Sequence, residues 1–403
     1  MNPRPFVLDM ETSDPDDFLT LLLLLGHPEV DLRAVTITPG TLEQVSVVRQ
    51  ALAWFGRSDI PVGCYDMSHA NNCVSEWHYK AYPQLKRGEA EMKDVAGPGW
   101  DVLANHLGPG VTMVEGAAPK NLGKLLTRVV EGSTPNFGSL FFQGCFAGEG
   151  VVPPEKQLEK FRGKVTCPSF NPNGDPKATL SILEHRGWFE DIRFVSKNVC
   201  HGVKYDSEMH ARFTAVAPTW CDHEVCGCMC HKNPGTMLHV MACCSPCSRC
   251  GQNVAGFEGA ATSPKALSQS LIYQGMTYYL AGHPKGKAFH DPLAACCAIN
   301  PTIGEWASVD LYRERGEWGA FLLPASGVRI IVGYDHEKFV RTLLGGTTDP
   351  LPVLTERNVE LEADRRGVQA SDIPDFERGI IAAVILSHAT GDLVADLIEG
   401  SGS

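Results

Sequence analysis

Five carboxylates lie within nine residues near the start of the chain, at Asp9, Glu11, Asp14, Asp16 and Asp17. The apolar run before them, Phe6–Leu8, predicts a short buried strand, and the run after them, Phe18–Leu25, predicts a buried helix. Asp14 and Pro15 supply N-cap and first-turn residues for that helix. The acidic stretch is therefore expected at the C-terminal end of a strand, where open α/β sheets bind ligands.

So many carboxylates in a small space repel one another unless a cation neutralises them or some of them hold protons. Ligation by oxygen alone favours a hard divalent ion such as Ca²⁺ or Mg²⁺. The alternative for this stretch taken alone is a solvated acidic helix start, because Asp and Glu favour the first turn of a helix.

Two later segments favour the metal site over the solvated helix start. Residues 288–295 place His290, Asp291 and a proline at the opening of an apolar helix, and residues 169–176 read Ser-Phe-Asn-Pro-Asn-Gly-Asp-Pro. With the acidic stretch, in this order and at this approximate spacing, they resemble the nucleoside hydrolase family of the inosine-uridine-preferring type. That family has an Asp-x-Asp…Asp-Asp loop that holds Ca²⁺, a Glu-Phe-Asn-x-x-x-Asp-Pro segment that grips ribose, and a late His-Asp-Pro. The resemblance covers roughly residues 5 to 345.

The resemblance implies Ca²⁺-dependent hydrolysis of the N-glycosidic bond of a ribonucleoside or nucleoside-like compound. By resemblance, the metal ligands are Asp9, Glu11, Asp17 and Asp291, with a backbone carbonyl at Glu115 or Gly116 completing the shell. The substrate-binding residues are Asp16, which would hold the ribose hydroxyls, and Ser169, Asn171, Asn173 and His201. His290 would act as general acid or stack near the base, and the family implies a homo-oligomer, either a dimer or a tetramer.

Three departures from the family pattern affect the expected site. The acidic loop has Glu11 in place of the second Asp, and one extra residue precedes Asp16. The general base is therefore either Glu11 or Asp9, with Glu11 preferred. Ser169 stands where the family has Glu, and Thr41 where it has Asn. These changes indicate a sugar or base other than that of inosine and uridine, unless they compensate one another and the substrate is ordinary.

The elements that must position these residues alternate between strand and helix. Apolar periodicity predicts strands at 32–39, 60–63, 139–143 and 192–199, and helices at 43–55, 177–186, 263–280 and 337–344. This alternation predicts an α/β fold with a mostly parallel central sheet, flanking helices and right-handed crossovers, Rossmann-like in kind. Strand-like segments between 309 and 332 suggest a small β-hairpin appendage. We expect one domain over residues 1–345, and a linker with a helical tail over 346–403.

Composition narrows the class of partner. The chain has 403 residues, of which 43% are hydrophobic, and a net charge of −12. That charge argues against non-specific binding of nucleic acid or of anionic membranes, because both reward basic patches. No apolar run is long enough to span a bilayer, and the start of the chain shows no signal-peptide pattern. The expected partner is a small nucleoside, and the expected compartment is the cytoplasm.

A cysteine-rich insertion at about 220–252 separates His201 from His290. It holds eight of the fifteen cysteines, and Cys226, Cys230, Cys244 and Cys247 have a spacing that suits Zn²⁺. The alternative is that these cysteines are reduced or lie in a disordered loop. A second class of function follows from the insertion, in which a non-catalytic or regulatory protein on the same scaffold uses a zinc-binding loop to bind a partner.

Overall fold

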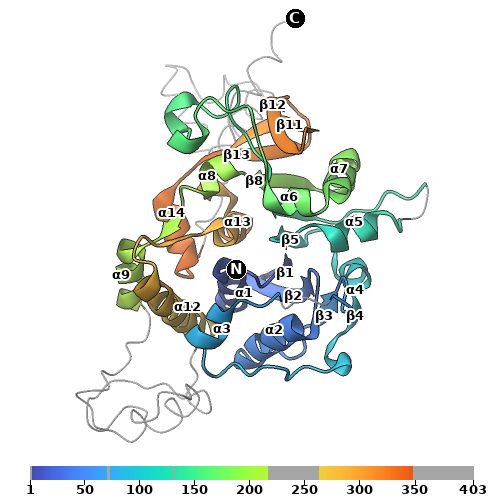
Figure 1. Cartoon of the computed structure of the whole chain (residues 1–403). Helices are drawn as coiled ribbons and strands as arrows, with labels where there is room; N and C mark the ends of the chain where they lie inside the picture. Colours follow the sequence, from blue (N-terminus) through green and yellow to red (C-terminus); the bar gives the residue numbers. More distant parts are fainter. Residues whose placement is uncertain (1, 70–72, 130–131, 217–262, 348–403) are drawn as a thin grey trace, which may run out of the picture.

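The computed structural model describes residues 2–69, 73–129, 132–216 and 263–347. Their centre is an 11-stranded sheet with helices on both sides (Figure 1). The strands are β1 (Arg4–Met10), β2 (Val30–Ile37), β3 (Val62–Cys64), β4 (Gly97–Pro98), β5 (Thr112–Glu115), β6 (Ser139–Gln143), β7 (Thr166–Cys167), β8 (Asp191–Val195), β9 (Lys204–Tyr205), β10 (Lys287–Ala288), β11 (Gly304–Glu314), β12 (Glu317–Leu322) and β13 (Val328–Tyr334).

The described α-helices are α1 (Pro15–Gly26), α2 (Leu42–Trp54), α3 (Glu76–Ala81), α4 (Gly99–His106), α5 (Lys120–Leu126), α6 (Phe170–Gly174), α7 (Pro176–Glu184), α8 (Lys197–Cys200), α9 (Ser207–Val216), α12 (Pro264–Gly282), α13 (His290–Ile299) and α14 (His336–Leu343). Short 3₁₀ turns among them are η1 (Met92–Asp94), η2 (Pro154–Lys156), η3 (Glu159–Phe161), η4 (Arg186–Trp188) and η6 (Pro301–Ile303).

The strand order is β4-β3-β2-β1-β5-β6-β8-β13-β11-β12-β7. From β4 to β13 each neighbouring pair is parallel, and from β13 to β7 each is antiparallel. The chain runs outward from β1 through β2 and β3, then returns to the other side of β1 at β5. This reversal makes the carboxyl ends of β1 and β5 the topological switch point, where open α/β sheets bind their ligands.

Both faces of the sheet are buried. Along β1, Phe6 and Leu8 point into a core shared with α1, α2, α12 and α13, while Val7 points into a second core shared with α4, α5 and α7. A strand covered on both faces needs no polar alternation, which is why Phe6–Leu8 reads as a continuous apolar run.

Helix α1 begins as the sequence predicts, with Asp14 as N-cap residue and Pro15 in the first turn. Its leucines from Leu21 to Leu24 are at most 1% exposed. Burying each side chain contributes roughly 1.5–3 kcal/mol, so this short helix is a large part of the core. It ends at Gly26, where a Cβ atom would lie 2.2 Å from the Cβ of Ser268 on α12. Glycine therefore permits the close packing of these two helices.

Two expectations from the sequence need adjustment. The strand predicted over 192–199 ends at Val195, and residues 197–200 form α8. The cause is local, since the carbonyl of Ser196 accepts hydrogen bonds from Val199 N and Cys200 N and turns the chain into a helix. The segments between 309 and 332 do form a hairpin, but β11 pairs with β13, so the hairpin continues the main sheet.

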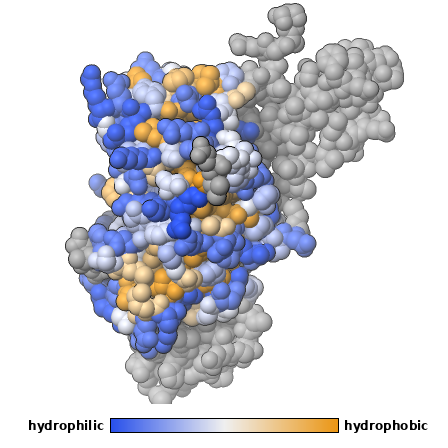
Figure 2. Space-filling view, turned by 90° about the vertical axis from the view of Figure 1, so that its right-hand side faces the viewer, coloured by the Kyte–Doolittle hydropathy of each residue, from blue (hydrophilic) through white to orange (hydrophobic). Residues whose placement is uncertain are grey.

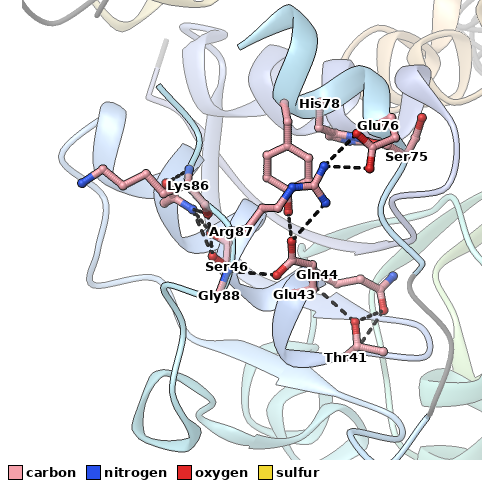
Figure 3. A network of polar contacts seen from close by, with 12 residues as sticks. Thr41, Glu43, Gln44, Ser46, Ser75, Glu76, His78, Lys86, Arg87 and Gly88 are labelled. Carbon is pink, nitrogen blue, oxygen red and sulfur yellow. Dashed lines mark hydrogen bonds and ion pairs between the residues drawn. The ribbon is translucent and has the colours of Figure 1, made fainter. Parts of the chain in front are cut away.

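Residues 64–110, whose pattern predicts no regular element, contain α3, η1, β4 and α4. A polar network holds α3 and the following loop against α2 (Figure 3). Arg87 pairs with Glu76 at 2.7 Å and stacks its guanidinium 3.9 Å from the centre of the Tyr79 ring, whose hydroxyl donates to Glu43. Such a network depends on residues far apart in the sequence and has no periodic signature.

The outer surface is mixed in character. On the face shown in Figure 2, hydrophobic residues form separate patches among hydrophilic ones. Within the described part of the chain, none of the helices has the length and apolar character needed to cross a membrane.

Candidate active site

A cavity of about 310 Å³ opens at the carboxyl ends of β1 and β5. Its lining comes from six separate parts of the sequence and consists of Glu11, Ser13, Asp14, Asp16, Asp17, Gly116, Gln143, Ser169, Phe170, Asn171, Lys197, His201, His290 and Asp291. The three motifs singled out in the sequence therefore meet at one place. The fold achieves this because each motif follows or opens an element at the same edge of the sheet.

One wall of the cavity, which we call the acidic wall, is formed by Glu11, Asp14, Asp16, Asp17 and Asp291. Carboxylate oxygens of Asp16, Asp17 and Asp291 lie within 4.8 Å of one another, and all three residues are buried. Such a cluster is unfavourable unless protons or a cation compensate the charge.

Asp16 is compensated within the chain. Its Oδ1 atom lies 2.9 Å from Nζ of Lys287, and its Oδ2 atom accepts hydrogen bonds from the backbone N–H groups of His290 and Asp291 at 3.0 and 3.4 Å. Burial alone would raise the pKa of Asp16, but Lys287 and His290 together outweigh it and the pKa lies below its usual value. Asp16 is therefore an ionised residue that fixes the start of α13 beside α1.

Asp17 and Asp291 have no such partner. Burial, and then the neighbouring carboxylates, raise the pKa of both residues well above the usual value. The Oδ1 atoms of both are buried and make no hydrogen bond to any described residue. Two unsatisfied carboxylate oxygens facing one cavity fit a hard divalent cation, which prefers oxygen ligands of this kind. The donor set present therefore suits the metal that the sequence predicts.

The two candidates for the general base occupy different positions. Glu11 lines the cavity, whereas Asp9 is completely buried beneath it and accepts a hydrogen bond from Asn121 Nδ2 at 3.1 Å. Burial is the main cause that raises the pKa of each carboxyl to about 7. A base with a pKa near neutrality is suited to taking up a proton, and the reach of Glu11 into the cavity distinguishes it from Asp9.

The carbonyl expected at Glu115 or Gly116 is placed by the end of β5. Gly116 lines the cavity, and its carbonyl accepts a hydrogen bond from Asn171 Nδ2 at 3.0 Å. The Glu115 side chain is fully buried and does not line the cavity, and its Oε1 accepts from the N–H group of Ala117 at 3.2 Å. Asn171 also donates to Gln143 Oε1 at 2.9 Å, so its amide bridges β5 and β6 at the cavity.

Two histidines stand side by side in the cavity. The ring centroids of His201 and His290 are 4.5 Å apart, and the Nε2 atom of His290 is buried with no described hydrogen-bond partner. Burial is the largest cause that lowers the pKa of His290 and that lowers the pKa of His201 to about 3. Both rings are therefore neutral at pH 7, and the unpartnered nitrogen of His290 is free for a ligand.

Ser169 and Asn173, both from the proposed sugar segment, differ in position. Ser169 lines the cavity, but Asn173 does not: its Oδ1 atom accepts from Trp318 Nε1 at 3.0 Å and its Nδ2 donates to Gly316 O at 2.8 Å. Asn173 thus ties α6 to the β11–β12 hairpin. Thr41, which stands where the family has Asn, caps α2 by accepting a hydrogen bond from Gln44 N, as seen in Figure 3.

Lys197 and Lys287, together with Gln143 and Asn121, belong to this site but are not marked by any of the three motifs. Lys287 lies three residues before His290, so its position beside an acidic cluster could have suggested an ion pair. Lys197 follows the end of β8, but the strand predicted over 192–199 contains it, so the strand-end rule did not select it. The cysteine-rich insertion, with Cys226, Cys230, Cys244 and Cys247, lies outside the described residues, as does the predicted tail beyond residue 347.

Comparison with known proteins supports the fold. No family model matches the sequence. Nucleoside hydrolase 3 of Arabidopsis thaliana is 40% identical over 73 residues, which are 17% of this chain and 8% of that protein. The chain thus matches only a short segment of that relative, and most of the relative's length is not covered.

Three solved structures are similar over nearly their whole length. A plant nucleoside hydrolase has a TM-score of 0.53 and 15% identity, covering 85% of this chain and 98% of that one. An inosine-guanosine nucleoside hydrolase gives 0.54 and 13%, with coverage of 85% and 98%. A purine-preferring ribonucleoside hydrolase from Gardnerella vaginalis gives 0.51 and 12%, with coverage of 85% and 97%. The resemblance read from the sequence is thereby confirmed at the level of the fold: this chain has the nucleoside hydrolase fold.

Proposed function

We propose that the protein hydrolyses the N-glycosidic bond of a ribonucleoside or nucleoside-like compound, with Ca²⁺ bound at the acidic wall. One observation carries the proposal. A single cavity brings together Glu11, Asp17 and Asp291 from the acidic motifs, Asn171 from the sugar segment and His290. A protein that used this scaffold for binding alone would have no need to bury so many ionisable groups around one cavity.

The reaction needs a base that takes a proton from the attacking water. Glu11 is the described residue best placed for this, because its carboxylate reaches the cavity and its pKa is raised to about 7, mainly by burial. As the water oxygen bonds to the anomeric carbon, the bond between that carbon and the nitrogen of the nucleobase breaks, and its electron pair leaves with the nucleobase. Asp9 accepts a hydrogen bond from Asn121 and does not line the cavity, so it is not assigned a contact with the substrate.

Hydroxyl groups of the sugar would bind Asp16 and Asn171. Asp16 already accepts from Lys287 and from two backbone N–H groups, yet a carboxylate has about four acceptor positions and keeps capacity for a hydroxyl. Asn171 is held by its amide nitrogen to Gly116 and Gln143, which fixes the orientation of its side chain. Preorganised partners of this kind lower the entropic cost of reaching the transition state.

We assign to His290 the role of assisting departure of the nucleobase. Its ring is neutral at pH 7, so it can donate one hydrogen bond to a nitrogen or oxygen of the base as electron density builds there. The adjacent His201 ring restricts how the imidazole can turn.

The residues that would hold Ca²⁺ are Asp17, Asp291 and Glu11, with the carbonyl of Gly116 as a further oxygen donor. The ion would lower the pKa of a bound water and neutralise the acidic wall. This assignment rests on the two unsatisfied carboxylate oxygens and on the lack of any described ion pair to Asp17 or Asp291, since Lys287 pairs with Asp14 and Asp16.

The test measures release of ribose and free base from a panel of nucleosides, by protein that has been stripped with chelator and then supplied with Ca²⁺, Mg²⁺ or Zn²⁺. We expect turnover that Ca²⁺ restores, and a loss of about a hundredfold or more in Glu11→Gln, as is typical of removing a general base. Glu89→Gln, which makes the same change at an exposed position, is the matched control. No release from any nucleoside under any metal condition would refute the proposed activity.

A further inference from the structure

Opposite in charge to the acidic wall, three lysines surround one aromatic ring. The ammonium groups of Lys160, Lys164 and Lys197 lie 5.0, 5.9 and 5.8 Å from the centre of the Phe161 ring. We call these three lysines and Phe161 the lysine corner. Phe161 is only 5% exposed, so the ring is a fixed platform on which the three cations converge.

None of the three lysines has a carboxylate partner within ion-pair distance among the residues that the structure describes. In a chain with a net charge of −12, three neighbouring cations without acidic partners are unusual. Like charges at this spacing repel one another, and the pKa of Lys160 is lowered by burial and by the nearby Lys197 and Lys204. Their repulsion would be relieved by an anion bound between them.

The lysine corner is joined to the cavity. Lys197 is one of the residues that line it, and its ammonium donates to the carbonyl of Pro168 at 2.7 Å, next to Ser169. An ammonium group has three donors, so Lys197 keeps donors for a ligand. Lys160 lies 2.8 Å from Nδ1 of His201, whose ring in turn stands 4.5 Å from that of His290. A short series of contacts thus leads from the proposed reaction centre to the lysines.

Lys197 is hydrogen-bonded to the residue that precedes Ser169, and Ser169, Phe170 and Gln143 are neutral members of the cavity lining. The described carboxylates of the lining all belong to the acidic wall. Phe170 is 76% exposed, so the cavity is open on this side. The cavity therefore has one end suited to a cation and hydroxyl groups, and another suited to a negatively charged substituent.

We propose that the lysine corner is a subsite for a phosphate group and that the preferred substrate is a nucleoside monophosphate. This inference rests on the proposed glycosidic-bond hydrolysis and adds the substrate class. The phosphate would lie at the mouth of the cavity, with Lys197 as its inner contact and Lys160 and Lys164 at the rim. The bond that breaks is still the one between sugar and base, so the products are a free base and a ribose phosphate.

Free inorganic phosphate could occupy the same lysines beside an unphosphorylated nucleoside. The experiment therefore has three arms: a nucleoside 5′-monophosphate, the corresponding nucleoside, and that nucleoside with inorganic phosphate added. Base release is measured in each arm as kcat/KM, and the sugar product is identified as ribose, ribose 5-phosphate or ribose 1-phosphate. Isothermal titration with ribose 5-phosphate and with ribose measures the subsite without turnover.

We expect kcat/KM to be higher for the monophosphate than for the nucleoside. That ratio should fall about tenfold in Lys197→Gln and in Lys160→Gln, as one charge-assisted contact to a partly exposed phosphate is lost. Lys197→Arg should retain most of the preference. Lys93→Gln, which removes an exposed lysine paired with Glu91, should leave the ratio unchanged.

Equal kcat/KM for the two substrates, with a ratio that does not change in Lys197→Gln, would overturn the phosphate subsite and leave the proposed hydrolysis intact. If inorganic phosphate accelerates base release from the nucleoside and the product is ribose 1-phosphate, the lysines bind a free anion. That result would also overturn the proposal that the substrate is a nucleoside monophosphate. No turnover in any arm, together with tighter binding of ribose 5-phosphate than of ribose, would instead count against the hydrolysis while supporting the subsite.

Discussion

The two ends of the cavity solve the problem of like charges in different ways. At the acidic wall Asp16, Asp17 and Asp291 are buried; Asp16 is neutralised by the buried Lys287, while Asp17 and Asp291 are left with unsatisfied oxygens. At the lysine corner, Lys160 and Lys164 are exposed and rest on Phe161, where water screens their repulsion. Burial makes the acidic wall demanding of a tightly bound cation, whereas exposure makes the lysine corner suited to an anion that exchanges.

Because one end is buried and the other is exposed, the two ends should respond differently to mutation. A change at the acidic wall alters charge in a medium of low dielectric constant, so its effect is large and reaches stability as well as turnover. A change at the lysine corner acts close to solvent and should affect substrate preference with little effect on stability.

The largest effect is expected for Asp291→Asn. The substitution keeps the size of the side chain but removes one of the two unsatisfied carboxylates, so Ca²⁺ binding should be lost and kcat/KM should fall about a thousandfold or more. Isothermal titration with Ca²⁺ and ribose release from the same preparations measure both quantities. Asp59→Asn, at an exposed aspartate paired with Arg57, is the control. Retained Ca²⁺ affinity in Asp291→Asn would show that the acidic wall is compensated by protons instead.

The sequence predicts one end of the cavity and not the other, for a physical reason. The acidic wall was predictable, because Asp9 to Asp17 and His290-Asp291 each lie at the junction between an apolar strand or helix and its neighbour. The lysine corner was not, because η3, the loop after it and α8 come together only in the folded sheet. Helix α8 was itself hidden, since Val199 extends the apolar run of β8. Likewise, no sequence pattern shows that Asn173 turns toward Trp318 while Asn171 faces the cavity.

A second, smaller effect is expected for Lys287→Met, which tests how Asp16 is neutralised. Lys287 is 6% exposed and pairs with Asp16 at 2.9 Å and with Asp14 at 3.1 Å. Removing one partner of a buried ion pair costs about 3–5 kcal/mol, because the other charge is left unpaired. The free energy of unfolding, from urea denaturation, should fall by that amount, and kcat/KM should fall about a hundredfold through a raised KM.

Lys285→Met removes an exposed lysine two residues earlier and is the control for this experiment. Lys287→Arg should recover part of the lost stability and affinity. If Lys287→Met loses stability while KM for the folded enzyme stays unchanged, Lys287 serves the fold alone, and Asp16 does not need it to bind the sugar.

The smallest effect concerns pH and separates the two ends most cleanly. The pKa of Asp9 is raised from 3.8 to about 7, chiefly by burial, so in protein without a cation this carboxyl stays protonated when folded and ionises when unfolded. Between about pH 4 and pH 7 the folded state binds the additional proton, and its stability therefore falls as the pH rises. One such group contributes a slope of about 1.4 kcal/mol per pH unit.

The buried histidines His27 and His78 act in the opposite direction, because their pKa values are lowered to about 4 by burial and the unfolded state takes up their protons first. The measurement is consequently a difference: urea denaturation of the chelator-treated protein and of Asp9→Asn at several pH values from 4.5 to 7. Subtracting the two curves cancels the histidines, and the variant should lack about one proton's worth of downward slope. Lys160→Gln should reproduce the wild-type slope, since lysines do not titrate in this range. An Asp9→Asn curve parallel to the wild type would mean that Asp9 is ionised in the folded protein. Asn121 and the neighbouring residues would then compensate a charge that burial alone disfavours.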